Sequence, residues 1–473
     1  MTDRSLSDIQ SDLRAGAYTC RALVEDYLKR ADAARPLNAY VEVWAEDALQ
    51  QADDIDRRLR EQPDSLGALF GAVVSIKDNI CYEGRQVTAA AKILEGFHSL
   101  YSATVVERVL AADAIIIGRT NCDQFGMGST NENSVYGPVR NAADPERIPG
   151  GSSGGGAVSV QTDSCLVAIG TDTGGSVRQP AAFCGIYGFK PSYGRISRHG
   201  ILAYGSSFDQ VGFLARHPED IARFLEVSAG PDDYDSTAAQ FGLTPSGGAA
   251  GRAYRIAYIP ETVESASVDA GVRSVTQAFI ARLKAAGCEV EPVAFDLLEY
   301  VIPTYYVLTT AEASSNLSRY DGIRYGYRSP AARNLEETYL LSRTEGFSDE
   351  VKRRILLGTF VLSSGYYDAY YSKAQKVRRL IRNQTFHILQ SYDFILMPAA
   401  PDVAERFGEG GAADPVAMYL SDIYTVTANL AGVPALSIPA GAHPDNGMPV
   451  GVQLMANMWK EMDLLDFAGS LTR

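Results

Sequence analysis

The chain has 473 residues, 46% of them hydrophobic, and a formal net charge of −14. This acidic balance excludes a protein that grips nucleic acid through its own surface, and the apolar fraction is ample for a large core. No apolar stretch is long enough to span a membrane, and a polar sequence follows Met1, so we expect a cytoplasmic protein without a secretory signal.

The first predicted elements are helices, because residues 5 to 62 place apolar side chains three and four positions apart. From about 68 to 215, short apolar runs alternate with helical segments such as ATVVERVLAA. This alternation is typical of a mostly parallel α/β sheet. The predicted strands are AVVSI at 72–76, AIIIG at 114–118, CLVAIG at 165–170 and IYGFK at 186–190.

The second half begins with a glycine-rich stretch at 230–251, which predicts a loop or flap. Residues 300–391 are long, helical and rich in tyrosine, and these aromatic rings are expected to pack the helices on the sheet. Further elements are the strands YRIAYIP (254–260), CEVEPVAF (288–295), FILMP (394–398) and VGVQLM (450–455), and a helix at 268–287.

These elements together predict an α/β fold with a large mixed, mostly parallel sheet covered by helices on both faces. We predict one domain over 1–473, with N-terminal helices (1–65), a catalytic α/β core (66–299), a helical segment (300–391) and closing strands and helices (392–473). The six cysteines are scattered and form no C-x-x-C pair, so we expect buried free thiols and no metal site.

Two glycine-serine clusters, IPGGSSGGG (148–156) and GTDTGGSVRQP (170–180), raise the question of a phosphate loop. Neither places a Lys after its last Gly, and no strand precedes the first, so phosphate binding is disfavoured. A nucleophile fits better: Ser176 follows a strand, and the backbone N–H groups of a glycine turn can converge on an oxyanion. The alternative is that both clusters are ordinary polar loops.

A serine nucleophile needs a base, and no histidine has a distinctive setting. The G-x-S-x-G motif of hydrolases with a Ser-His-acid triad is also absent. Lys77 in GAVVSIKDNI ends a run that predicts a buried strand, and burial lowers the pKa of an amine until it can act as a base. Either Ser152 or Ser153 could relay the proton. The residues therefore predict a Ser-Ser-Lys hydrolase.

The KDN, GGSSGG and GTDTGGSVRQPAAFCG segments resemble the amidase signature family. In that family the relay serine lies 24 positions before the nucleophile, a spacing that matches Ser152 and Ser176 here. The resemblance implies Lys77 as the base, Ser152 as the proton relay and Ser176 as the nucleophile. It places the oxyanion hole on the backbone N–H groups of Thr173, Gly174, Gly175 and Ser176.

Outside this core, TNCDQFGMGSTNENSVYGPVRN, EASSNLSRYDGIRYGYR and MYLSDIYTVTANLAGVPALSIP resemble the A subunits of the aspartyl/glutamyl-tRNA(Asn/Gln) amidotransferases. The resemblance implies hydrolysis of glutamine or asparagine to release ammonia. A B subunit would use that ammonia, with ATP and Mg, to amidate a mischarged tRNA that it binds, and a C subunit would join both. No cofactor is expected in this chain.

The family's substrate residues map onto Tyr305, Arg354 and Asp422, with Tyr306 and Arg353 as close rivals. Free glutamine carries an α-carboxylate and an α-ammonium, which need a cation and an anion respectively. The alternative for Arg354 and Asp422 is a structural ion pair.

Departures from the family pattern are small. Gly156 stands where Ser is common, and Cys122 and Gln124 stand where Met and Glu are usual. The chain also ends slightly early, so we expect its final helix to be shortened.

Two further hypotheses remain open. A stand-alone amidase would share Lys77, Ser152 and Ser176, but the matches outside the core argue against it. A non-catalytic binding subunit that kept the fold is disfavoured because those three residues are intact. The choice between glutamine and asparagine, and between tRNA(Gln) and tRNA(Asn), is not determined by the sequence.

Overall fold

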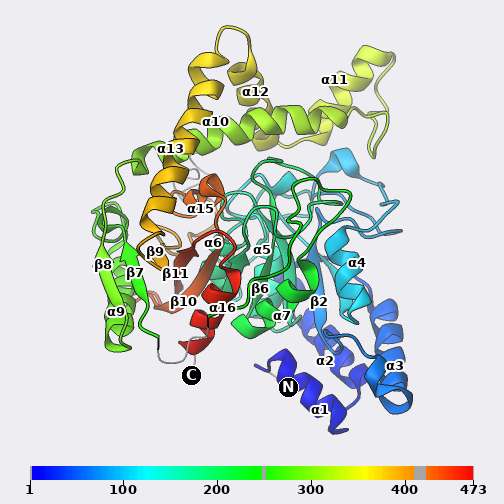
Figure 1. Ribbon diagram of the computed structural model, residues 1–473. Coiled ribbons are helices and arrows are strands. Elements are labelled where there is room, and N and C mark those ends of the chain that lie inside the picture. Colours follow the sequence, from blue (N-terminus) through cyan, green and yellow to red (C-terminus); the bar gives the residue numbers. More distant parts are fainter. Residues whose placement is uncertain (1–2, 248–251, 410–421, 472–473) are drawn as a thin grey trace.

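A computed structural model describes residues 3–247, 252–409 and 422–471, and a single sheet of eleven strands runs through it (Figure 1). The strands are β1 (Tyr40–Val43), β2 (Val73–Lys77), β3 (Ile115–Thr120), β4 (Val167–Asp172), β5 (Tyr187–Lys190), β6 (Gln210–Ala215), β7 (Arg255–Tyr258), β8 (Glu289–Pro292), β9 (Phe394–Pro398), β10 (Ala435–Ala442) and β11 (Pro449–Ala456). Their order across the sheet is β1-β3-β2-β4-β6-β5-β10-β11-β9-β7-β8.

The helices connect and cover these strands. They are α1 (Leu6–Arg14), α2 (Cys20–Ala33), α3 (Ala45–Glu61), α4 (Thr104–Ala111), α5 (Gly154–Gln161), α6 (Arg178–Cys184), α7 (Pro218–Ser228), α8 (Pro260–Val263), α9 (Ala270–Ala285), α10 (Leu298–Asn316), α11 (Leu335–Gly346), α12 (Asp349–Leu362), α13 (Lys373–Ile388), α15 (Val426–Ala431) and α16 (Glu461–Ser470). Several begin at the capping residues that the sequence supplies: the Ser5, Asp269 and Ser348 side chains accept N–H bonds from the first turns of α1, α9 and α12. Within the described residues, no helix is long and apolar enough to cross a membrane.

The sheet is mixed, as predicted, but the prediction that it is mostly parallel is wrong. Strand β2 is parallel to β3 and β4, and β7 is parallel to β8 and β9. The central strands from β4 through β6, β5, β10 and β11 to β9 pair antiparallel, as does β1 with β3. Strands β6 and β10 were absent from the sequence prediction. A short connection over 443–448 joins β10 to β11 as an antiparallel pair, whereas the longer segment 191–209 joins β5 to β6.

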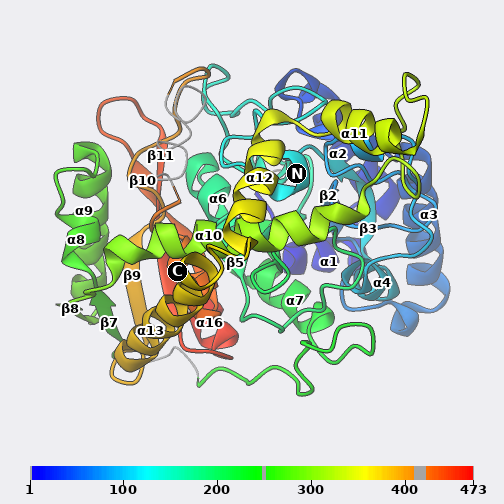
Figure 2. The same cartoon turned by 90° about the horizontal axis from the view of Figure 1, so that it is seen from above.

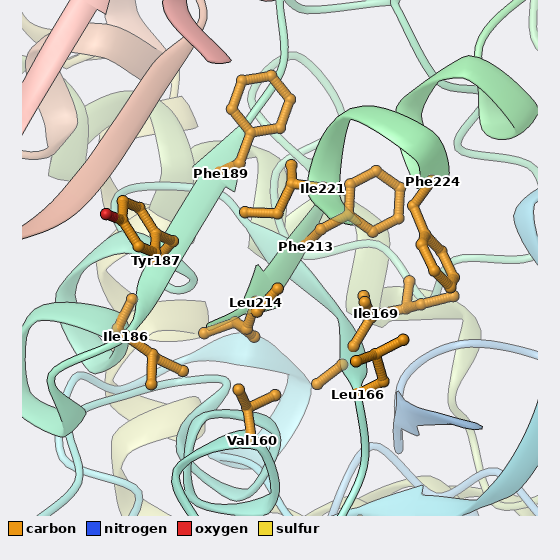
Figure 3. Close-up of a cluster of buried hydrophobic side chains, with 14 of the residues drawn as sticks. Val160, Leu166, Ile169, Ile186, Tyr187, Phe189, Phe213, Leu214, Ile221 and Phe224 are labelled. Carbon is orange, nitrogen blue, oxygen red and sulfur yellow. The ribbon is translucent and has the colours of Figure 1, made fainter. Parts of the chain in front are cut away.

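Helices pack on both faces of the sheet, which confirms that part of the prediction. On β6, Phe213 meets Phe224 of α7 with ring centroids 5.9 Å apart, whereas Leu214 points to the opposite face, toward α5 (Figure 3). The same alternation recurs on β9: Phe394 packs on Phe467 of α16 with ring centroids 4.9 Å apart, whereas the next residue, Ile395, belongs to a second hydrophobic cluster. Successive strand residues face opposite sides, so a core forms above and below the sheet.

The N-terminal helices are interrupted by one strand that was not predicted. Residues Tyr40–Val43 form β1 at the edge of the sheet, inside the stretch predicted to be helical. The stretch YVEV has only four residues, so the alternation of apolar and polar side chains that marks a strand cannot be recognised between two amphipathic helices. All six cysteines are free, and all but Cys288 are buried, as predicted.

The tyrosine-rich segment forms a helical layer at one edge of the molecule. Helix α10 crosses above the sheet, α12 lies on its outer side, and α13 returns the chain toward β9 (Figures 1 and 2). The glycine-rich stretch contains no helix or strand over 230–247, as predicted, and residues 248–251 lie outside the described residues.

Candidate active site

Two parallel strands bring the predicted residues to one edge of the sheet. Lys77 is the last residue of β2, and the turn that carries Ser176 follows directly on β4. Since β2 and β4 are parallel neighbours, their carboxyl ends meet at the same edge. The GGSSGG segment leads into α5, which packs on both strands and places Ser152 and Ser153 beside Lys77.

The Lys77 amine is buried and surrounded by hydroxyl groups. Its side chain is 1% exposed, and Nζ donates to Ser152 Oγ at 2.7 Å, Ser153 Oγ at 2.9 Å and Thr171 Oγ1 at 3.0 Å. Burial lowers the pKa of Lys77, although the neighbouring Cys122 and Asp123 act in the opposite direction. A buried amine with a lowered pKa and hydroxyl partners can hold and release a proton.

The two neighbouring serines differ in what else their hydroxyl groups contact. Ser153 Oγ donates to the Thr171 carbonyl at 3.3 Å, and a side chain at Gly170 would touch it, so Ser153 faces the sheet. Ser152 Oγ bonds to Lys77 and lies 3.5 Å from the position a Cβ would take on Gly126. The Ser152 proton is therefore uncommitted, which favours Ser152 over Ser153 as a relay independently of sequence spacing.

The turn from Thr173 to Ser176 is held open by a buried carboxylate. Asp172 Oδ1 accepts the Gly175 N–H at 2.9 Å, and Oδ2 accepts the Val177 N–H at 3.3 Å. Gly175 has φ 131°, a conformation that side chains rarely adopt, and a Cβ there would overlap Thr425. Within the described residues, the N–H groups of Thr173, Gly174 and Ser176 bond to no protein acceptor.

Ser176 lies at the end of this turn and is 8% exposed. Its carbonyl accepts the Ser153 N–H at 3.0 Å, which joins the Ser176 turn to the GGSSGG segment. In the part of the chain that the structure describes, the Ser176 hydroxyl makes no hydrogen bond, so it is free to rotate. The Gly175 N–H is already bonded to Asp172, which leaves three of the four predicted oxyanion donors without a protein acceptor.

Asp172 belongs to a buried ionic network that sequence reasoning missed. Both its carboxylate oxygens pair with the Arg178 guanidinium at 2.9 and 3.0 Å, and Asn429 of α15 donates to it at 3.0 Å. Burial would raise the pKa of Asp172, but Arg178 outweighs it and holds that pKa at about 2. Arg178 also donates to the Thr425 carbonyl and to Gln453 of β11. The sequence did contain a sign of this network, because Asp172 and Arg178 are the two charged residues of the glycine motif GTDTGGSVRQP.

Replacement of Arg178 by Met should destabilise the fold by about 3–5 kcal/mol, because Asp172 would remain buried without its cation. Urea unfolding at neutral pH measures the change. The matched control is Arg57→Met, which breaks the exposed pair with Asp54 and should leave stability unchanged. An Arg178→Met stability equal to that of the unsubstituted chain would contradict the role given to this pair.

The residues predicted to bind substrate gather around Tyr306. Its hydroxyl donates to Asp422 Oδ2 at 3.3 Å, and the Arg354 guanidinium lies 5.3 Å from its ring centre. The Tyr305 hydroxyl lies instead against Gly174, where a Cβ would overlap it. Both tyrosines therefore reach the site, Tyr306 beside Arg354 and Asp422 and Tyr305 beside the nucleophile turn.

Arg354 and Arg353 point in different directions from α12, one inward and one outward. Arg354 is 3% exposed and donates to Glu350 Oε1 at 2.7 Å and Tyr204 Oη at 2.8 Å, whereas Arg353 lies outside and pairs with the other Glu350 oxygen. The structure therefore favours Arg354 for contact with a ligand. The start of α12 is tied to the catalytic side by Gln124, whose Oε1 accepts the Ser348 N–H at 3.0 Å.

Two carboxyl groups near Arg354 have raised pKa values, one fully buried (Asp123) and one partly buried (Asp422). Burial raises the pKa of Asp422 to about 7, although Arg354 and the Tyr306 hydroxyl act against it. Burial also raises the pKa of Asp123 to about 7, despite N–H bonds from Asn131 and Asn133. Perturbed carboxyl groups beside a nucleophile and a lysine are typical of functional sites.

Comparison with known proteins gives a consistent result. The family model described as Amidase matches residues 22–465. The A subunit of the glutamyl-tRNA(Gln) amidotransferase from Prosthecochloris aestuarii is 47% identical over 98% of this chain and 97% of its own length. The solved A subunit of the same enzyme from Thermotoga maritima has a TM-score of 0.78 at 34% identity, covering 98% of this chain and 93% of that one. A solved amidase has a TM-score of 0.83 at 29% identity, covering 99% of each chain.

The family match covers the strands, turns and helices that build this site, from α2 to α16. Both the lysine with its serines and the glycine turn lie within it. The chain therefore belongs to the amidase family.

Proposed function

We propose that this protein is the A subunit of an aspartyl/glutamyl-tRNA(Asn/Gln) amidotransferase and hydrolyses glutamine, or asparagine, to supply ammonia. The observation that carries the proposal is the 47% identity to the A subunit of a glutamyl-tRNA(Gln) amidotransferase over nearly the whole length of both chains. The fold alone does not separate this function from other amidases, since a solved amidase at 29% identity superposes with a TM-score of 0.83, against 0.78 for the solved A subunit.

The geometry supports a Ser-Ser-Lys mechanism. The neutral Lys77 amine accepts the proton of Ser152, which in turn takes the proton of Ser176 as its oxygen attacks the amide carbon. The oxyanion that forms is stabilised by the free N–H groups of the turn, those of Thr173, Gly174 and Ser176.

Collapse of this intermediate breaks the C–N bond, and the proton returns through Ser152 to the nitrogen, which leaves as ammonia. The γ-glutamyl group is then an ester on Ser176. Water adds to that ester as its proton passes to Lys77, and the same proton then returns through Ser152 to the Ser176 oxygen as the ester bond breaks and glutamate is released.

The substrate would lie between α10, α12 and the segment that begins at Asp422. Arg354 supplies a fixed cation for the α-carboxylate, and its Glu350 partner holds the guanidinium in place. Asp422, with Tyr306 beside it, supplies an anion for the α-ammonium. Tyr305 stands against Gly174, where it would contact the amide end of the substrate.

The KM for glutamine should rise as the pH falls below about 7, by about tenfold per pH unit. The reason is that the raised pKa of Asp422 leaves this carboxyl protonated in the free enzyme at lower pH, whereas an ammonium group needs the carboxylate. Steady-state kinetics from about pH 5 to pH 8 measures the effect. Asp422→Asn should bind glutamine more weakly and lose this dependence. A flat KM for the unsubstituted chain would contradict the assignment.

The proposal implies partners that this chain does not contain. B and C subunits would complete the enzyme, the B subunit binding the mischarged tRNA and using ATP and Mg, in the cytoplasm. The net charge of −14 supports this division of labour, because an acidic chain repels the phosphates of ATP and tRNA.

The test is reconstitution with candidate B and C subunits from the same genome, assayed for glutamine-dependent amidation of Glu-tRNA or Asp-tRNA. Glutamine hydrolysis should rise several-fold when the partners, ATP and mischarged tRNA are added, since ammonia without an acceptor wastes glutamine. Full glutamine turnover by the isolated chain, with broad tolerance of other amides, would instead establish a stand-alone amidase.

A further inference from the structure

Helix α12 carries an apolar stripe on the side that faces away from the protein. Its inner side consists of buried residues, among them Arg354. On its outer side Leu356 is 70% exposed, Leu357 36% and Phe360 43%. Residues three or four positions apart are neighbours on a helix surface, so Phe360 lies beside both Leu357 and Leu356, and the three exposed side chains form one apolar strip.

The strip continues onto both neighbouring elements. Leu340 of α11, 62% exposed, lines with Leu356 a groove of about 480 Å³ between the two helices. At the other end, Tyr366 and Tyr370 pack on Phe360 with ring centroids 4.3 and 5.8 Å away. We call these six residues the α12 stripe: Leu340, Leu356, Leu357, Phe360, Tyr366 and Tyr370.

Exposed apolar side chains are concentrated in this region. Of the nineteen large hydrophobic side chains exposed among the described residues, ten fall between Leu335 and Leu380. Single exposed hydrophobic residues are normal on any surface, but a concentration of this kind marks a protein-protein contact. The leucines Leu340, Leu356 and Leu357 offer neither a hydrogen bond to a phosphate nor a ring on which a base could stack, so a protein fits this surface better than a nucleic acid does.

The charge around the stripe indicates the kind of partner. Residues 335–382 contain nine Lys and Arg against six Asp and Glu, a net charge of +3 in a chain of −14. Helix α13, which follows Tyr370, exposes Lys373, Lys376, Arg379 and Arg382 and contains no acidic residue. Two copies of this face would bring like charges together, so a second copy does not fit, and a protein with an acidic rim does.

We propose that the α12 stripe is the docking site for the partner subunit that receives the ammonia, through an apolar surface with an acidic rim. This inference rests on the proposed function. Leu356 and Arg354 lie on opposite sides of one helix, about 10 Å in diameter, and α12 lies on the outer side of α10, which carries Tyr306 (Figures 1 and 2). A partner on the stripe therefore contacts the reverse side of a helix that forms the substrate site.

The test measures the Kd between this chain and a purified complex of the B and C subunits from the same genome. Leu356→Asp and Phe360→Asp should each weaken binding by at least about tenfold, because they place a charge at the centre of an apolar contact. Leu100→Asp is the matched control: Leu100 is 84% exposed but lies outside the stripe, so binding should not change. Leu356 and Leu100 are largely exposed, so thermal unfolding and basal glutamine hydrolysis should remain unchanged in their variants. Phe360 also packs on Tyr366, so its variant is compared at a temperature well below its own unfolding transition.

Three results would overturn the docking site. The first is a Kd that is the same for all variants, or no binding by the unsubstituted chain. The second is a homodimer in sedimentation that Leu356→Asp dissolves, which would make the stripe a self-contact. The third is salt-sensitive binding of tRNA by the isolated chain that both Lys376→Glu and Leu356→Asp abolish. A complex that binds through the stripe but never amidates tRNA would refute the proposed function alone.

Discussion

Ser176→Ala is expected to reduce glutamine hydrolysis by about 10⁴-fold or more, because the substitution removes the atom that would carry the acyl group. The hydroxyl makes no hydrogen bond within the described residues, so the fold should be as stable as before. Steady-state ammonia release measures the loss. Amidation driven by added ammonium salts in the assembled complex should survive, since it bypasses glutamine.

The covalent intermediate offers an independent measurement. After reaction with a glutamine-derived electrophile, mass spectrometry should locate the adduct on Ser176 and find none in the Ala variant. Ser318→Ala, a substitution of an exposed serine beyond α10, is the control and should label fully. An adduct on Ser152 or on any cysteine would refute Ser176 as the nucleophile.

Lys77→Met should lower glutamine hydrolysis by at least about 10²-fold, the usual scale for losing general acid–base help. Met keeps most of the side-chain volume, so the cavity beside Ser152 stays filled while the proton acceptor is lost. Because burial lowers the pKa of Lys77, activity of the unsubstituted chain should increase as the pH rises through that pKa and the amine becomes neutral. The variant should lack this increase, and a pH–rate profile tests both points.

The control for Lys77 is the ammonia-dependent reaction of the assembled complex. It should be retained in Lys77→Met, because the amine takes part only in glutamine hydrolysis. If both reactions fell together, Lys77 would be a structural residue that holds Ser152, Ser153 and Thr171 in place.

The sequence predicted the parts of the site that are local. Lys77 ends a continuous apolar run, and Ser176 follows another, so strand ends and glycine turns were readable without a structure. The spacing between Ser152 and Ser176 depended on a family resemblance. The structure adds a physical reason, because only Ser153 is committed to the Thr171 carbonyl.

The choice between adjacent residues could not be made from sequence. Neighbours on a helix point about 100° apart, so Arg353 and Arg354 differ only in which side of α12 faces the site. The structure distinguishes the two arginines, because Arg354 is buried on the side of α12 that faces the site. Tyr305 and Tyr306 posed the same problem, and both prove to reach the site, one beside Gly174 and one beside Asp422.

Long-range pairings were equally out of reach. Asn429 bonds to Asp172 across 257 positions of sequence, and no local pattern encodes such a partner. Strands β6 and β10 were missed for a related reason, since the sequence does not show which strands lie beside them in the sheet. Without these two strands, the antiparallel centre of the sheet could not be predicted. Register and strand order depend on these distant contacts.

The network around Arg178 also bears on when activity first arises during synthesis. Arg178 needs Thr425, Asn429 and Gln453, and the last of these lies 275 positions later in the chain. At about 5–20 residues per second, a ribosome needs about 14 to 55 s to cover that distance. Throughout this interval the nascent chain holds Lys77, Ser152 and Ser176 but lacks the residues that hold Arg178 beside the Ser176 turn. We therefore expect glutamine hydrolysis to begin only after Gln453 has been synthesised.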